Sequence, residues 1–138
     1  MNPNPSHPAP RKSIRNIGIG DLRHYLLPVP GVLSILHRVS GLLMFLLLPV
    51  LLWLFELSLS SERSYALFVD ISRNFLGRLV LLGLAWALLH HLCAGVRFLL
   101  LDLHIGTDRA AARASSWAVF AASIALTLLM ALLLFGAF

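Results

Sequence analysis

Charged residues are scarce in this 138-residue chain: they make up 12% of it, hydrophobic residues make up 59%, and the mean hydropathy is +0.85. Soluble globular domains carry about 25% charged residues, so the composition excludes that class.

Cysteine is nearly absent too. Cys93 stands alone, which excludes an internal disulfide and a cysteine-ligated zinc or iron–sulfur centre. The hydrophobic runs also lack the alternation of a membrane β-barrel, so the predicted fold class is an all-α membrane protein.

The net charge of +5 does not indicate nucleic-acid binding, because the basic residues are spread between hydrophobic runs. Basic residues placed in this way act as topology signals, since they accumulate on the cytoplasmic side. One side of a three-span protein carries Arg11, Lys12, Arg15, Arg23, Arg109 and Arg113, and the other carries Arg63, Arg73 and Arg78. This excess predicts a cytoplasmic N-terminus and a C-terminus on the opposite side.

Residues 1–21 are predicted to be a flexible tail, because their first part is rich in proline and asparagine. No apolar segment follows the basic residues there, so the tail does not read as a signal peptide. Residues 22–138 form one membrane domain with three helices at about 30–57, 76–101 and 115–136. Each helix exceeds the roughly 20 residues that cross about 30 Å of hydrocarbon.

The segment between the first two spans is predicted to be a polar loop at 58–66, followed by an amphipathic lead-in at 67–78. Pro49 lies inside the first span. A proline there either kinks the helix or is accommodated by a neighbouring helix.

Three polar or ionisable residues, Ser34, His37 and Arg38, stand where the first span enters the membrane, and Gly41 follows them. Their spacing of i, i+3, i+4 and i+7 places all four on one helical face. Such groups are costly in lipid, so the face is predicted to look toward a bound molecule or a partner helix. Two simpler interpretations stay open: Arg38 could extend to the interface, and Ser34 could bond its own helix backbone.

A second polar group, His90 and His91, lies inside the second span. His91 precedes Asp102 by 11 residues, roughly 16 Å along the helix, so its imidazole needs a partner within the hydrocarbon. That partner is either a haem iron or a group on another helix, and His91 taken by itself is compatible with both. Gly95 lies one turn further on the same face, where it suits either a flat macrocycle or close helix packing.

The topology places His37 and Arg38 nearer the cytoplasm than His91. Haem propionates could therefore meet His37 and Arg38, because arginine forms bidentate bonds with carboxylates. Ser34 and Arg38 could also bond the carbonyl of a quinone. Arg97 is predicted to extend to the interface beside Asp102, and His90 to make a supporting or partner contact.

The segments around residues 34–41 and 91–102 resemble parts of the cytochrome b subunits of succinate dehydrogenase, the larger membrane anchors of respiratory complex II. Ser34-Ile-Leu-His37-Arg38-Val-Ser40-Gly41, preceded by Pro28, matches their S-I-x-H-R-x-[ST]-G signature. His91-x-x-x-Gly95-Val96-Arg97 with Asp102 matches H-x-x-x-G-[IV]-R-H-x-x-x-D. The resemblance covers roughly residues 22–135. It departs at Phe98, where the family often has histidine, and in residues 1–21, which lack the R-P-L-S-P-H lead-in.

The resemblance implies half of a heterodimeric anchor bundle in a bacterial inner membrane. His91 would be one axial ligand of haem b, and a histidine of the small anchor subunit would be the other. His37 and Arg38 would contact the propionates. Ser34 and Arg38 would line a ubiquinone pocket completed by the small anchor and the iron–sulfur subunit.

The resemblance also implies a place in respiratory electron transport and the tricarboxylic acid cycle. A flavoprotein subunit would oxidise succinate, and electrons would pass through iron–sulfur clusters to the quinone, so this chain would anchor and bind. A haemless structural anchor is the alternative. A self-contained cytochrome, with His37 and His91 on one haem, ranks third. Transport ranks last, because three spans without broken-helix pairs offer little for a pathway.

Overall fold

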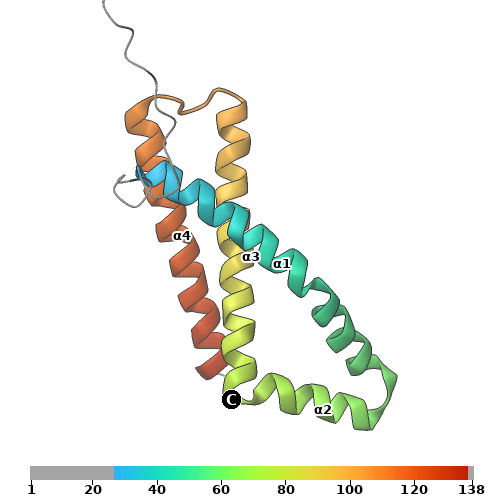
Figure 1. The fold of residues 1–138 in the computed structure, drawn as a ribbon. Helices are drawn as coiled ribbons and strands as arrows, with labels where there is room; N and C mark the ends of the chain where they lie inside the picture. The colour runs from blue at the N-terminus through green and yellow to red at the C-terminus, as the bar shows by residue number, and fades with distance from the viewer. Residues whose placement is uncertain (1–26, 137–138) are drawn as a thin grey trace, which may run out of the picture.

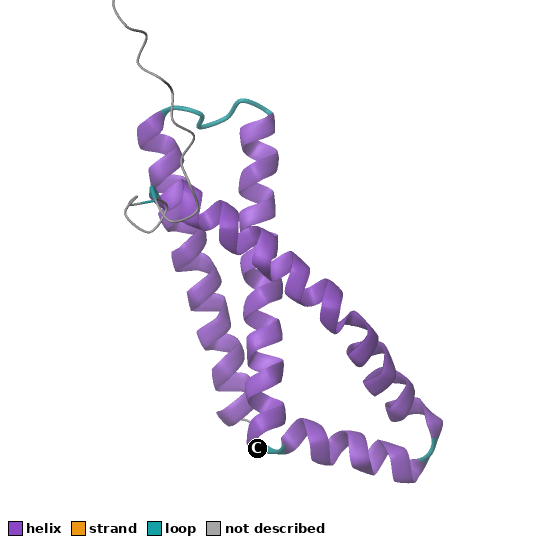
Figure 2. Ribbon diagram, in the orientation of Figure 1, coloured by secondary structure: helices purple, strands orange, loops and turns teal. Residues whose placement is uncertain are grey.

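The computed structural model describes residues 27–136, and that range contains four α-helices and no strand (Figures 1 and 2). The helices are α1 (Val29–Ser60), α2 (Glu62–Arg73), α3 (Phe75–Asp102) and α4 (Arg109–Gly136). The three predicted spans correspond to α1, α3 and α4, each long and apolar enough to cross a membrane. The predicted tail and its basic cluster lie outside the described residues.

The helix starts follow from local capping chemistry. Ser61, Asn74 and Asp108 each accept a backbone N–H of the helix that they precede, at 3.2, 2.7 and 2.9 Å. Such caps satisfy donors that a helix start leaves without an intrahelical partner. The start of α1 instead has a proline in its first turn, where the missing N–H costs nothing.

Two predicted boundaries are wrong. The segment 58–66 is not a loop, because α1 continues to Ser60 and α2 begins at Glu62, with Ser61 alone between them. The hydroxyls of Ser58 and Ser60 bond carbonyls of their own helix, which allows serines to continue it. The last helix begins at Arg109, not near 115, because the Asp108 cap precedes an alanine-rich stretch of high helix propensity.

Helices α3 and α4 run side by side, joined at one end by a short connection (Figure 1). Helix α1 continues through Pro49, crosses α3 in its first half, and then diverges from it, while α2 joins the far ends of α1 and α3. The small core lies where the three long helices meet, at Leu33, Ala94 and Val119. Small buried residues such as Ala87 and Ser116 let α3 and α4 approach closely.

Arg97 ties α3 to α4, and its predicted place at the interface beside Asp102 is wrong. Its side chain is only 5% exposed. Nε donates to Ser115 Oγ at 2.9 Å, and a terminal guanidinium nitrogen donates to the Ala112 carbonyl at 3.0 Å. Residues five apart on a helix point roughly 140° away from each other, so Arg97 faces α4 while Asp102 is exposed.

Removing the hydroxyl that Arg97 bonds is expected to destabilise the α3–α4 pair. The change Ser115→Ala leaves a buried charged donor without an acceptor, which costs about 1–3 kcal/mol. The matched control is Ser60→Ala, because the Ser60 hydroxyl bonds only its own helix and is exposed. Thermal unfolding of the assembled protein in detergent measures the difference, and equal midpoints for both variants would contradict this role of Ser115.

Candidate functional site

The crossing of α1 over α3 brings two of the predicted site residues into contact. The imidazoles of His37 and His91 stack with centroids 4.1 Å apart and planes 16° apart. The Phe98 ring lies 5.1 Å from that of His37. His37 was predicted nearer the cytoplasm than His91, yet the rings lie against each other. Counting residues along separate helices does not give relative depth when one helix crosses another obliquely (Figure 1).

Both hydrogen bonds of His91 involve Nδ1. This atom lies 3.0 Å from the backbone carbonyl of His37 and 3.3 Å from the hydroxyl of Ser40. A carbonyl oxygen can only accept, so Nδ1 carries the proton and donates. In a neutral imidazole the other nitrogen, Nε2, then holds a free lone pair. Metal-bound histidines commonly have this arrangement, with the second ring nitrogen donating to a carbonyl.

A buried nitrogen of His37 has no partner within the described part of the chain. His37 Nε2 is shielded from solvent and makes no hydrogen bond to any residue of 27–136. Buried polar atoms are almost always paired, because leaving one unpaired in an apolar environment costs free energy. The same lack of a partner holds for His90 Nε2, so an unpartnered buried nitrogen does not by itself locate a cofactor. The nitrogen of this site that suits a metal-bound cofactor is Nε2 of His91.

His90 faces a different neighbour from His91. Its side chain is fully buried between α3 and α4, with ring centroids 5.4 Å from Trp86 and 5.7 Å from Phe120. Nδ1 lies 3.4 Å from the hydroxyl of Ser123. His90 therefore packs against α4, and His91 is the histidine that faces α1.

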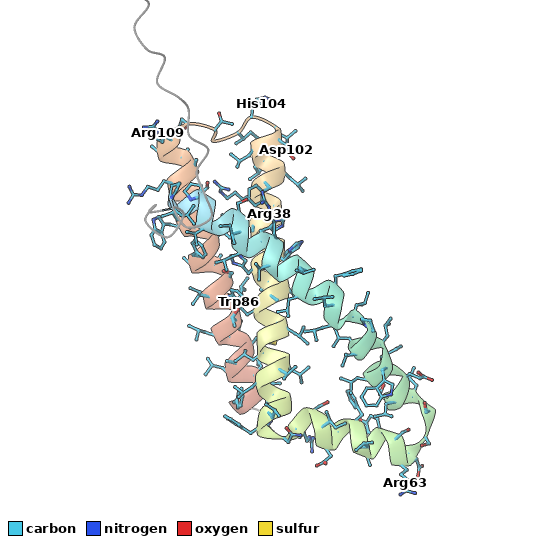
Figure 3. The ribbon with its side chains drawn as sticks, in the orientation of Figure 1. Arg38, Arg63, Trp86, Asp102, His104 and Arg109 are labelled. Carbon is cyan, nitrogen blue, oxygen red and sulfur yellow. The ribbon has the colours of Figure 1, made fainter. Side chains whose placement is uncertain are left out.

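Ser34 and Arg38 lie one turn apart on α1, with Ser34 half-buried and Arg38 exposed. Neither side chain makes a hydrogen bond to another residue of the described range, and Ser34 does not bond its own helix as Ser40 does. Arg38 lies toward the end of the molecule that carries Asp102 and Arg109 (Figure 3). Arg63, on α2, lies at the opposite end (Figure 3). As far as residues 27–136 are concerned, both α1 side chains are therefore available to a ligand or partner.

The structure adds a contact that sequence reasoning missed. Gly41 was predicted to share the site face, and Ser40 was given no contact. Here a Cβ at position 41 would lie 2.8 Å from His91 Cε1, so the ring occupies the space that the glycine leaves. A Cβ at Gly95 would lie 3.6 Å from His37 Nε2, an ordinary contact distance. The Ser-Gly pair that ends the first motif was the available signal.

A cavity of about 290 Å³ lies elsewhere, between the diverging halves of α1 and α3. Its walls are almost entirely apolar, including Leu47, Leu51 and Leu84. None of the predicted site residues lines it. The predicted quinone-site residues Ser34 and Arg38 therefore lie outside this cavity, and Arg38 is exposed.

Residues 18–130 match the family model described as the succinate dehydrogenase/fumarate reductase transmembrane subunit. The chain belongs to this family. It is 32% identical over 114 residues to the succinate dehydrogenase cytochrome b556 subunit of Paracoccus denitrificans, covering 83% of this chain and 88% of the relative. The corresponding subunit of Rickettsia felis is 32% identical over 106 residues, covering 77% and 82%. That of Coxiella burnetii is 34% identical over 104 residues, covering 75% and 83%.

Family membership and fold agree. A succinate dehydrogenase/fumarate reductase transmembrane subunit requires membrane-crossing helices, and the structure has three that are long enough. The chain is therefore a multi-pass subunit of the bacterial inner membrane, a succinate dehydrogenase membrane anchor of the cytochrome b type.

Proposed function

We propose that this succinate dehydrogenase anchor subunit holds one axial position of haem b through His91 and forms part of a ubiquinone-reducing site through Ser34 and Arg38. The single observation that carries the haem proposal is the bonding of His91. Its Nδ1 donates to the His37 carbonyl at 3.0 Å, which leaves the Nε2 lone pair free. The names of the relatives, cytochrome b556 subunits, support the same conclusion.

His37 and Arg38 are proposed to bond the haem propionates. The ring of His37 stacks on that of His91 with centroids 4.1 Å apart, so it lies beside the proposed haem ligand. Arg38 is exposed and permanently charged, so it suits a carboxylate. Haem b, when bound, takes up and releases single electrons. The contribution of this chain is to ligate it, orient it and neutralise its acidic edge.

Ser34 and Arg38 are proposed to bind the quinone head group. Their side chains lie on one face of α1 and bond nothing within the described chain. A hydroxyl can donate to a quinone carbonyl, and a fixed guanidinium charge stabilises the negative charge that develops there as electrons arrive. Because Arg38 is exposed on this chain, we propose that the small anchor and the iron–sulfur subunit enclose the quinone site.

The proposed partners also include the flavoprotein subunit, which would oxidise succinate. The second axial haem ligand is proposed to be a histidine of the small anchor subunit. The stacking of His37 and His91 argues against both residues ligating one haem, because centroids 4.1 Å apart leave no room for a macrocycle between the rings. The N-terminus is proposed to face the cytoplasm, which would place Arg38 nearer that side than Arg63.

A dithionite-reduced minus oxidised visible spectrum of the purified four-subunit complex tests this proposal. We expect a b-type α-band, with haem and covalently or tightly bound flavin present in comparable amounts. A complex that assembles and contains flavin but shows no such band would refute the haem assignment. This chain would then be a haemless anchor, and the hydrogen bonds of His91 would be helix–helix contacts alone.

A further inference from the structure

Two groups of α1, the Ser40 hydroxyl and the His37 carbonyl, lie within hydrogen-bond distance of His91 Nδ1. The Ser40 side chain is 1% exposed, and its oxygen lies 3.3 Å from His91 Nδ1. The same hydroxyl donates to the His37 carbonyl at 2.9 Å, and that carbonyl lies 3.0 Å from Nδ1. His91 Nδ1, Ser40 Oγ and the His37 carbonyl oxygen thus each lie within hydrogen-bond distance of the other two. The two oxygens belong to one turn of α1.

The direction of each bond in this set is determined by the carbonyl. Because the carbonyl accepts from Ser40, the Ser40 hydroxyl hydrogen is used, and its lone pairs face Nδ1. Nδ1 must then be the donor to both oxygens. The opposite tautomer would set a ring lone pair against the carbonyl lone pairs at 3.0 Å. The bonding pattern on α1 therefore selects one tautomer of His91.

Gly41 determines where the ring can lie. A Cβ at this position would lie 2.8 Å from His91 Cε1 and 3.2 Å from Nδ1. The first distance is shorter than real side chains tolerate, so an alanine here would push the ring away from α1. Gly83 offers a direct contrast on α3, since a Cβ there would meet nothing within 4 Å.

We propose that the His37 carbonyl, Ser40 and Gly41 form a seat that fixes the tautomer and orientation of the His91 imidazole. Ser40 and Gly41 are thus positioning residues for the axial ligand. The polar motif on α1 then divides into two parts. The side chains of Ser34, His37 and Arg38 serve the quinone and the haem propionates, and Ser40 and Gly41 serve a histidine of another helix. This inference rests on the proposed haem ligation by His91.

The seat has a consequence for the strength of the ligand. An imidazole that donates from one ring nitrogen is a more basic ligand through the other, and outer hydrogen bonds of this kind typically change metal affinity by about 10–100-fold. Removing the Ser40 hydroxyl is therefore expected to weaken haem retention and to raise the haem midpoint potential, because a less basic ligand stabilises the oxidised form less.

The experiment compares variants of the purified complex by haem loss and spectroscopy. Ser40→Ala is matched with Ser58→Ala, because both hydroxyls bond a carbonyl three residues earlier on α1 and Ser58 has no histidine neighbour. Gly41→Ala is matched with Gly83→Ala. The readouts are the rate of haem transfer to apomyoglobin, the midpoint potential, and carbon monoxide binding, which reports an open axial position.

For Ser40→Ala we expect haem loss on the order of tenfold faster than in the wild type and a raised potential, both restored by Ser40→Thr. For Gly41→Ala we expect carbon monoxide binding or loss of haem. Ser58→Ala and Gly83→Ala should behave as the wild type. If the Gly41→Ala complex does not assemble, the Ser40 variants decide alone.

Two failures can be distinguished. A wild-type complex without haem would overturn the proposed function itself. A wild-type complex whose haem is lost in His91→Leu, but in which Ser40→Ala matches Ser58→Ala in haem loss and potential, would overturn the seat alone.

Discussion

Replacing His91 with leucine is expected to abolish the b-type α-band of the assembled complex, whereas the same change at His90 should preserve it. His91 faces α1 with Nε2 free, while His90 is buried against Phe120 of α4 and Trp86 of its own helix. Neighbouring residues on a helix point about 100° apart, so only one of the pair can address a cofactor at the α1–α3 crossing. The reduced minus oxidised visible spectrum measures the band directly.

The His90→Leu variant is the matched control, since it makes the same substitution one residue away. It should lower thermal stability, because it removes the bond to Ser123 and the ring contact with Phe120 across the α3–α4 interface, together with the Trp86 contact within α3. Loss of the band in His90→Leu with retention in His91→Leu would reverse the assignment. Retention in both variants would mean that haem ligation does not come from this pair.

The membrane spans could be predicted from the sequence because the physical constraint is strong. Inside a lipid bilayer, every backbone N–H and C=O group must be hydrogen-bonded within the protein. A long apolar run is therefore expected to form a helix. The ends of the helices were less predictable. The serines around Ser61 suggested a loop, yet Ser58 and Ser60 bond back to their own helix and one residue suffices to turn the chain. The start of α4 had a usable signal in Asp108, which precedes an alanine-rich stretch.

The sequence could identify candidate site residues, but it could not predict how they lie relative to one another. Spacing placed Ser34, His37 and Arg38 on one face of a helix, because helical periodicity is a property of one segment. The stacking of His37 on His91 depends on where α1 crosses α3, and a single sequence does not specify a crossing point. The same limit applies to Arg97, whose acceptors, Ser115 and the Ala112 carbonyl, lie on the next helix.

The contribution of Ser40 required tertiary information for a further reason. A serine inside a helix commonly bonds a carbonyl of its own preceding turn, and Ser40 does so at 2.9 Å. Only the neighbouring helix shows that the same oxygen faces His91 Nδ1. The Ser40 hydroxyl therefore makes both a bond within its own helix and a contact with His91 on α3. Only the first could be predicted from the sequence.

Replacing Arg38 with leucine is expected to lower the quinone-dependent kcat/KM of the complex by on the order of 10- to 100-fold, because a charge-assisted hydrogen bond is worth about 1.5–3 kcal/mol. Ser34→Ala should have a smaller effect, since it removes a neutral donor. Arg63→Leu is the matched control, because Arg63 is exposed and lies on α2 at the far end of the molecule (Figure 3). Succinate-dependent reduction of added ubiquinone measures the effect.

Succinate oxidation by a soluble artificial acceptor, measured on the same preparations, separates a quinone defect from a failure of assembly. That activity does not need the anchor's quinone site, so it should be equal in wild type, Arg38→Leu and Arg63→Leu. A parallel fall in both activities for Arg38→Leu would indicate a damaged complex and remove the support for a quinone contact. Unchanged ubiquinone reduction would place the site elsewhere. Because Arg38 is also proposed to face the haem propionates, the haem spectrum of the variant is recorded beside the kinetics, and a kinetic loss with an unaltered spectrum would assign the effect to the quinone.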